Sequence, residues 1–398
     1  MRKWTIFGVV YLALIVAIMS QFKVPPVMGV LMKEFHVNAV TAGWFMSVFS
    51  VMGIILAFPA AMILKRFGPK ISGMVALSCT VLGSAVGAMA ATSAVLLTGR
   101  VIEGTGLALL CVIAPSVIAM HFDRKEIGIP MGLLATWYPV GSTLAYNVSQ
   151  PVVQAFGNWR GVWWFDATLA LVALVLYAVV VTKPANAAVR HEQSGPKVPY
   201  FAGLKNARMW LLATTFLFLV MGRLGFMTWA PKYLADAFKV TAAQAASVSS
   251  LGFLSAAVGG ILCSVIFNRV KNKNVLYLGF PIIALILYPI AYLLPYGLIP
   301  PWLIITGICT GFIGAANWAM IPNIVSSPIH IGLGMGVVSL MQGISNFSSP
   351  PIVGYFIAGN NWTRAVLPIT VFCILALIVA IAFVKVNSKA RQLKDEQQ

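Results

Sequence analysis

An arginine stands inside an apolar run that is long enough to cross a lipid bilayer. The run opens after Arg208 and stays apolar past Trp229. At about 1.5 Å per residue Arg223 lies about 22 Å from the basic edge, and the hydrocarbon is about 30 Å thick. An arginine at that depth costs about 2.5 to 3.5 kcal/mol and normally faces a bundle interior or a wet cavity. Arg223 therefore predicts a polar pathway in which a guanidinium binds an anion. The alternative is an arginine that only ties helices together through carbonyls or a carboxylate.

A lysine occupies a comparable place in the first apolar run. Lys23 is followed by Pro25 and Pro26, which remove two backbone donors and are expected to kink or unwind the helix there. Lys23 lies about 28 Å along a run longer than the bilayer, so it is deep if the helix is tilted. Lys23 and Arg223 would form a basic pair that binds a carboxylate or phosphate and is relieved of its own repulsion. In the alternative, Lys23 extends to the outer headgroups.

Polar side chains and aromatics are dense in the run from Thr136 to Asn147. Tyr138, Ser142 and Tyr146 recur every four residues and share one stripe of a helix. We expect Tyr138 and Ser142 to be hydrogen-bond partners in a cavity. The alternative is close helix packing through small and hydroxyl residues, which is common in membranes.

Further polar groups of this kind occur in the last third of the chain. Gln342 and Asn346 are four residues apart and lie on one helix face. Together with Asn317 they are expected to be ligands, whereas Trp229 and Trp318 are expected to be cavity walls.

Only two acids lie inside apolar runs. Glu103 comes three residues after Arg100, which predicts an intrahelical ion pair. Asp166 stands beside Trp163 and Trp164 and is either interfacial or buried. Either acid, if buried, could carry a proton. If neither does, the protein would be an exchanger or a uniporter without a proton site.

The composition requires that membrane helices position these residues. The chain has 398 residues, of which 60% are hydrophobic and 9% charged, and its mean hydropathy is +0.91. A soluble globular domain does not have this composition. The net charge of +18 would suggest nucleic acid in a soluble protein, but the basic residues sit in short loops and therefore report topology. We expect no nucleic-acid partner, no metal and no cofactor, since the five cysteines are not paired at metal-ligand spacing.

Charge, proline and Asn/Gly punctuation divide the chain into twelve apolar runs, which predict an all-α polytopic membrane protein with twelve transmembrane helices. The runs cover residues 4–31, 38–64, 71–93, 95–121, 127–155, 159–182, 209–234, 241–267, 275–295, 300–325, 331–358 and 362–385.

The distribution of positive charge predicts the orientation. The loops on the side of the N-terminus hold 19 of the 27 lysines and arginines, which places both termini in the cytoplasm and the protein in the cytoplasmic (inner) membrane. The longest loop is polar and proline-rich, and we read residues 183–208 as a cytoplasmic linker. It separates a six-helix half, 1–182, from a second half, 209–386, which a short cytoplasmic tail, 387–398, follows.

A weak internal repeat supports two pseudo-symmetric halves. A shift of 203 positions lays basic loop residues and helix-end residues of the first half on like residues of the second half. The matched pairs are Arg66 with Arg269, Lys70 with Lys273, Gly104 with Gly307, and Asn158-Trp159 with Asn361-Trp362. Such a repeat implies a substrate site near the midplane, at the interface of the halves.

At this point the chain resembles the major facilitator superfamily over essentially its whole length. The loop Lys65-Arg66-Phe67-Gly68-Pro69-Lys70 looks like the family's G-x-x-x-D-R-x-G-R-K loop, although Lys65, and Asn268 in the second half, stand where aspartate is usual. The stretch from Arg100 to Gly106 matches its fourth-helix R-x-x-x-G-x-G pattern. The resemblance implies gating roles for Arg66, Arg269 and Arg100, and relatives tie the last of these to proton coupling. The fifth-helix motif of the drug antiporters is absent from residues 131–155, which argues against multidrug export.

Within that superfamily, the stretch from Arg223 to Leu234 is similar to the R-(Y/x)-G-x-x-x-W-x-P-x-Y-L segment of the organic-anion branch. In that branch the arginine contacts the anionic group of the substrate, and another arginine lies in the first helix. By spacing, Gln21 fits this first-helix position at least as well as Lys23. The first span and Trp159-Arg160 more loosely resemble cyanate-transporter-like members.

These features favour a secondary carrier that moves a small organic anion, a mono- or dicarboxylate, by alternating access, with a proton as a candidate co-substrate. The alternatives are an efflux carrier for small neutral or drug-like compounds and a receptor built on a carrier fold. An enzyme is not expected, because the sequence has no P-loop, no metal-ligand cluster and no nucleophile with a nearby histidine. The expected surroundings are a lipid bilayer, and we expect a monomer.

Overall fold

The computed structural model describes residues 2–57, 59–123, 126–182, 200–267, 269–270, 272–325 and 329–395, and this part of the chain is helical without a strand. Its α-helices are α1 (Arg2–Phe22), α2 (Val24–Glu34), α3 (Ala39–Ser47), α4 (Val51–Ile55), α5 (Pro59–Ala88), α6 (Ser93–His121), α7 (Gly128–Leu134), α8 (Trp137–Phe156), α9 (Arg160–Val180), α10 (Ala207–Phe238), α11 (Ala242–Ile266), α12 (Lys273–Leu287), α13 (Ile299–Ile324), α14 (Ile329–Phe356) and α15 (Val366–Asp395). Short 3-10 helices are η1 (Val48–Ser50), η2 (Tyr200–Lys205), η3 (Pro289–Tyr292), η4 (Tyr296–Leu298), η5 (Ala358–Asn360) and η6 (Trp362–Ala365).

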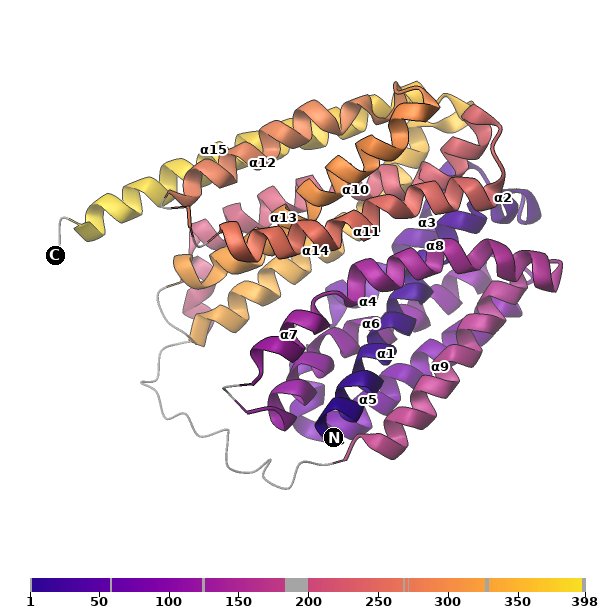
Figure 1. Ribbon diagram of the computed structural model, residues 1–398, viewed down its shortest axis with the longest axis horizontal. Coiled ribbons are helices and arrows are strands. Elements are labelled where there is room, and N and C mark those ends of the chain that lie inside the picture. The colour runs from indigo at the N-terminus through magenta and orange to yellow at the C-terminus, as the bar shows by residue number, and fades with distance from the viewer. Residues whose placement is uncertain are drawn as a thin grey trace.

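The helices form the predicted twelve-span fold. In the described part of the chain nine helices are long and apolar enough to cross a membrane. Three further spans are the broken series of α3, η1, α4 and the start of α5, the pair α7 and α8, and α14. The spans form two lobes, α1 to α9 and α10 to α15 (Figure 1). Most of the predicted linker, residues 183–199, lies outside the described residues.

The first span breaks where its prolines predicted a break. α1 ends at Phe22, and α2 begins at Val24 with Pro25 and Pro26 in its first turn, where proline is tolerated because the N–H groups there have no helical acceptor. Lys23 is the residue between the two helices. The predicted kink is confirmed, and it places a charged side chain at the point where the helix is interrupted.

A glycine turn separates the second and third spans within α5. Gly68 has φ 74° and ψ 169°, a conformation that a residue with a Cβ rarely adopts. The turn falls inside the predicted loop of residues 65–70. At the other end of the chain α15 continues to Asp395, ten residues beyond the predicted end at 385.

The glycines that the internal repeat matched make equivalent close contacts. A Cβ at Gly104 would lie 1.9 Å from the Phe49 carbonyl oxygen, and one at Gly307 would lie 1.9 Å from Ser255 Oγ. Phe49 belongs to the second span and Ser255 to the eighth, so each glycine lets its helix approach the corresponding neighbour in its own half. Glycine is required at both positions because any side chain would push these helices apart.

The two halves meet at one end of the bundle. There Asn147 Nδ2 of α8 donates to Ser250 Oγ of α11 at 2.9 Å, and the Tyr146 hydroxyl donates to the Met227 carbonyl of α10 at 2.7 Å. A Cβ at Gly43 in α3 would lie 2.7 Å from Pro351 Cα in α14. Both termini lie at the opposite end (Figure 1).

Candidate functional site

Arg223 lies in the middle of α10 and is buried without a partner. Its side chain is 6% exposed, and neither Nη1 nor Nη2 has a hydrogen-bond partner among the residues that the structure describes. Gly252 of α11 makes room for it, since a Cβ there would lie 2.3 Å from Nη2. The guanidinium carbon lies 5.8 Å from the ring centroid of Trp302 in α13. A buried charge of this kind needs a partner that the described chain does not supply.

The groups around the guanidinium are neutral. Tyr138 and Tyr146 of α8, Tyr288 after α12, and Cys309 of α13 are close enough to interact with it electrostatically. These side chains come from both halves, so Arg223 lies where the halves meet. We name Arg223, Gly252, Tyr138, Tyr288 and Trp302 the Arg223 site.

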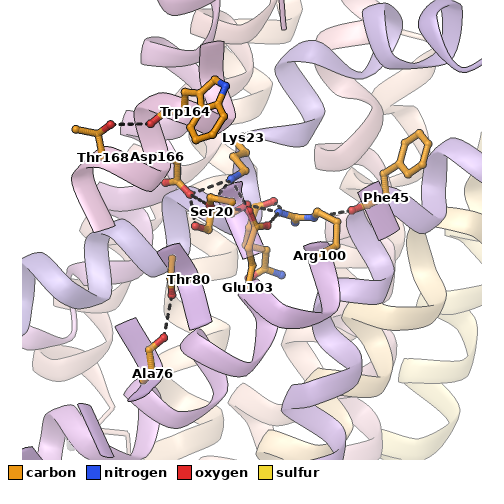
Figure 2. A network of polar contacts seen from close by, with 12 residues as sticks. Ser20, Lys23, Phe45, Ala76, Thr80, Arg100, Glu103, Trp164, Asp166 and Thr168 are labelled. Atoms are coloured by element: carbon orange, nitrogen blue, oxygen red, sulfur yellow. Dashed lines mark hydrogen bonds and ion pairs between the residues drawn. The ribbon is translucent and has the colours of Figure 1, made fainter. Parts of the chain in front are cut away.

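Lys23 is held by two carboxylates of its own half. Its Nζ lies 2.7 Å from Glu103 Oε1 of α6 and 2.9 Å from Asp166 Oδ2 of α9, and it donates to Ser84 Oγ at 3.0 Å. The ammonium also lies 4.9 Å from the Trp163 ring centroid. Figure 2 shows Lys23 between the two acids, which come from different helices.

Arg100 completes this group on the other side of Glu103 (Figure 2). Its Nη1 lies 2.5 Å from Glu103 Oε2, as the spacing predicted, and its Nε donates to the Phe45 carbonyl at 2.9 Å. Its Nη2 donates to the Gln21 carbonyl at 3.0 Å. In an unbroken helix that carbonyl would need the N–H that Pro25 lacks, so Arg100 satisfies a group that the break in the first span leaves free.

We name Lys23, Arg100, Glu103 and Asp166 the buried charge cluster. Its two cations and two carboxylates are all buried, with Lys23 and Asp166 each 2% exposed. The predicted basic pair of Lys23 and Arg223 is therefore not formed: Lys23 is neutralised inside its half, because two acids distant in sequence reach it. Two alternatives are also wrong: Lys23 does not extend to the headgroups, and Asp166 is not interfacial. Both side chains are buried.

Asp166 is the least satisfied member of the cluster. Its Oδ2 accepts from Ser20 Oγ and Ser84 Oγ, whereas its Oδ1 is buried and has no hydrogen-bond partner in the described part of the chain. A cavity of about 10 Å³ is lined by Met19, Lys23 and Asp166 among others. That volume is of the order of one water molecule.

The three polar residues that share one face of α8 have different surroundings. Ser142 Oγ donates to the Tyr138 carbonyl at 2.7 Å, a bond within its own helix, so the packing alternative describes it. The Tyr146 hydroxyl donates to the Met227 carbonyl across the interface between the two halves. The Tyr138 ring packs edge-on against Phe22, with 5.6 Å between the ring centroids. Tyr138 is half-buried and lies close enough to Arg223 to interact with it electrostatically.

The remaining candidates lie in the second half, except Gln21. Trp229 is fully buried and donates from Nε1 to the Pro350 carbonyl at 3.1 Å, which makes it a wall between α10 and α14. Asn317 accepts from the Tyr277 hydroxyl at 2.8 Å, and its Nδ2 has no partner among the described residues. Gln342 and Asn346 are half-buried on α14. Gln21 is buried and serves Arg100 through its carbonyl.

Arg66 and Arg269 lie outside the core. Both side chains are exposed, and the Arg66 guanidinium lies 5.4 Å from the Phe67 ring centroid. Within the described ranges neither arginine belongs to an ion pair, and the carboxylate latch of related loops is replaced here by Lys65 and Asn268. The gating role of these two residues stays a prediction.

Sequence reasoning missed four residues: Ser84, which contacts the buried charge cluster, and Gly252, Tyr288 and Trp302 of the Arg223 site. A serine, a glycine and two aromatics in apolar helices are common packing residues, so no spacing marks them. Their roles appear only when α5, α11, α12 and α13 are packed. No group of three or more histidine, cysteine, aspartate or glutamate side chains that could hold a metal ion occurs in the described part of the chain.

Fold and site together define a polytopic membrane protein with two helical halves and a buried cation at their interface. A family model described as Major Facilitator Superfamily matches residues 10–329. The chain therefore belongs to the major facilitator superfamily.

The chain is similar to transporters of anionic sugar acids. It is 23% identical over 373 residues to the hexuronate transporter of Bacillus subtilis (strain 168), covering 88% of this chain and 87% of that protein. It is 26% identical over 183 residues to the probable galactarate/D-glucarate transporter GudP of Pseudomonas putida, covering 44% of this chain and 40% of that protein. In several other matches the chain also spans less than half of the relative. The hexuronate and galactarate/D-glucarate relatives are named as transporters, which together with the family match points to a transporter and not to an enzyme.

A solved structure supports the fold over the whole chain. The bacterial homolog of the human lysosomal transporter Spinster, in an inward-facing and occupied conformation, superposes with a TM-score of 0.78 over 96% of each chain, at 16% identity.

Proposed function

We propose that the protein is a secondary transporter that moves a small organic anion across the cytoplasmic membrane by alternating access. The observation that carries the proposal is Arg223, a buried cation without a partner in the described chain. The hexuronate and galactarate/D-glucarate transporters among the relatives support an anionic substrate.

The units that move would be the halves 1–182 and 209–386, joined by the linker 183–208. Tyr138 and Tyr146 come from the first half and Arg223 from the second, so the site is complete only when the halves are together. An anion bound to Arg223 offsets the cost of keeping that charge away from water, so it favours the arrangement in which the two halves are closed around the site. The halves would then close only when substrate is bound, as transport of the substrate requires. The basic loops near the termini support an orientation with both termini in the cytoplasm.

We propose Asp166 as the first candidate for carrying a coupled proton, ahead of Glu103. Both oxygens of Glu103 are paired, with Lys23 and Arg100, whereas Asp166 Oδ1 has no hydrogen-bond partner among the described residues and the residue borders the small cavity. A proton on Asp166 would weaken its attraction for Lys23 and so change the packing of α1 against α9.

The test is uptake of labelled hexuronate and galactarate into proteoliposomes. Arg223→Ala should lower uptake at least about 100-fold, since it removes the charge that binds the anion, and Arg223→Lys should restore little because lysine lacks the two parallel N–H donors. Arg364→Ala is the matched control, because it removes an exposed arginine that has no assigned role in binding or gating. Normal uptake by a folded Arg223→Ala protein would overturn the proposal.

A further inference from the structure

The buried charges of the described residues leave one cation unmatched. Three lysine or arginine side chains are buried there, Lys23, Arg100 and Arg223, and two carboxylates, Glu103 and Asp166. Both carboxylates are committed to Lys23 and Arg100 at 2.5 to 2.9 Å. The charge that remains is a single positive one, on Arg223.

The free guanidinium has the shape that fits one carboxylate. Nη1 and Nη2 both lack hydrogen-bond partners in the described chain, and the two parallel N–H groups of an arginine match the two oxygens of one carboxylate. Gly252 lets the guanidinium lie against α11, since a Cβ there would come within 2.3 Å of Nη2. One carboxylate would therefore satisfy both nitrogens and neutralise the site.

Among the described residues the other buried cations, Lys23 and Arg100, are paired with carboxylates, so the surroundings of Arg223 offer no second unpaired buried positive charge. Tyr138, Tyr288 and Trp302 are neutral. Phe253 extends this aromatic group, because its ring centroid lies 6.4 Å from that of Tyr138 and 5.0 Å from that of Phe22. Tyrosine hydroxyls can donate to hydroxyl or carbonyl groups, and aromatic faces can pack on an uncharged body. A second carboxylate here would be a buried, unpaired charge.

We infer that the Arg223 site selects organic anions with a single ionised carboxylate and discriminates against dicarboxylates of the same carbon skeleton. The inference rests on the proposed function and narrows it. It also separates the two activities that the names of the relatives describe, because a hexuronate carries one carboxylate and a glucarate carries two. The chain should resemble the first in its preference.

The test uses two series of compounds that differ in the number of carboxylates. The first is galactitol, galactonate and galactarate, which are open six-carbon chains with zero, one and two carboxylates. The second is benzyl alcohol, benzoate and terephthalate, which tests the aromatic walls. Thermal unfolding of the purified full-length protein and competition for proteoliposome uptake are measured for each compound at pH 7.

The monocarboxylate of at least one series should raise the unfolding temperature and compete best. The dicarboxylate should bind at least about tenfold more weakly, because its second charge has no cation. Lowering the pH toward 4 should narrow this difference, since part of the dicarboxylate is then singly ionised. The order should persist in Arg223→Lys at lower affinity, because that variant keeps the number of charges.

The outcomes separate the two hypotheses. If neither series stabilises the protein and Arg223→Ala transports normally, the proposed function fails and the inference with it. If dicarboxylates bind as well as or better than monocarboxylates in an Arg223-dependent way, the protein is an anion carrier and only the inference is overturned.

Discussion

The buried charge cluster and the Arg223 site occupy related places in the two halves but balance charge in opposite ways. Under the shift of 203 residues Ser20 corresponds to Arg223, and Lys23 corresponds to Phe226. The remaining cluster members Arg100, Glu103 and Asp166 correspond to Leu303, Thr306 and Ile369, all of which are buried. One half thus satisfies its charges internally, and the other presents a charge for an external partner.

This difference suggests a division of tasks between the halves. In the buried charge cluster of the first half both cations have a carboxylate within 2.9 Å, so the cluster holds α1, α6 and α9 together whether or not substrate is present. In the second half the positions around Arg223 are apolar or aromatic, which keeps the guanidinium unpaired and strengthens its attraction for an anion. Removing a buried cation should therefore destabilise the protein in the first half and stabilise it in the second half.

The largest stability effect is expected for Lys23→Met. Removing this cation leaves Asp166 and one oxygen of Glu103 unpaired in the core, which should destabilise the protein by about 3 to 5 kcal/mol. Thermal unfolding in detergent measures the loss. The double variant Lys23→Met, Asp166→Asn restores neutrality and should recover a large part of it. An unchanged unfolding temperature in the single variant would show that the cluster is not what holds these helices.

The opposite substitution in the other half should stabilise the empty protein. Arg223→Met removes a buried charge without a partner and should raise the free energy of unfolding by about 1 to 3 kcal/mol. The same variant should bind no anion, so added substrate should produce no further thermal shift. A destabilised Arg223→Met protein would mean that the guanidinium has a structural partner and would contradict the comparison.

The sequence was enough to find these two regions, but it did not show that one pairs its buried charges internally and the other does not. A charge in an apolar run is visible without a structure, and so are the prolines after Lys23. The partner of Lys23 was not, because Asp166 is 143 residues away and only the packing of α9 on α1 brings them together. The role of Ser142 as a ligand stays a prediction, since a helix-internal hydroxyl bond and a ligand bond have the same sequence pattern.

Coupling to protons should depend on the first half alone. If Asp166 carries the proton, Asp166→Asn should abolish the stimulation of uptake by an inward proton gradient, a loss of about tenfold or about 1.4 kcal/mol of driving force. Exchange of internal for external substrate should persist, because it needs no net proton movement. Uptake with and without an imposed pH gradient, compared with Glu103→Gln, measures the effect. Full stimulation in the Asp166→Asn protein would remove Asp166 from the coupling path.

The smallest effect is expected where the two regions are joined. The Tyr146 hydroxyl of the first half donates to the Met227 carbonyl, which is one helical turn from Arg223. Tyr146→Phe removes this hydrogen bond between the halves and should weaken their contact by about 0.5 to 1.5 kcal/mol, because one buried carbonyl loses its donor. Accessibility of a cysteine placed at Ala39, a buried residue of α3 whose carbonyl lies against Gly354 of α14, should rise several-fold with labelling reagents. Tyr177→Phe, which removes a hydroxyl bond within the first half, is the matched control and should leave that accessibility unchanged. Equal labelling in both variants would show that the halves are held by backbone packing at Gly43 and not by this bond.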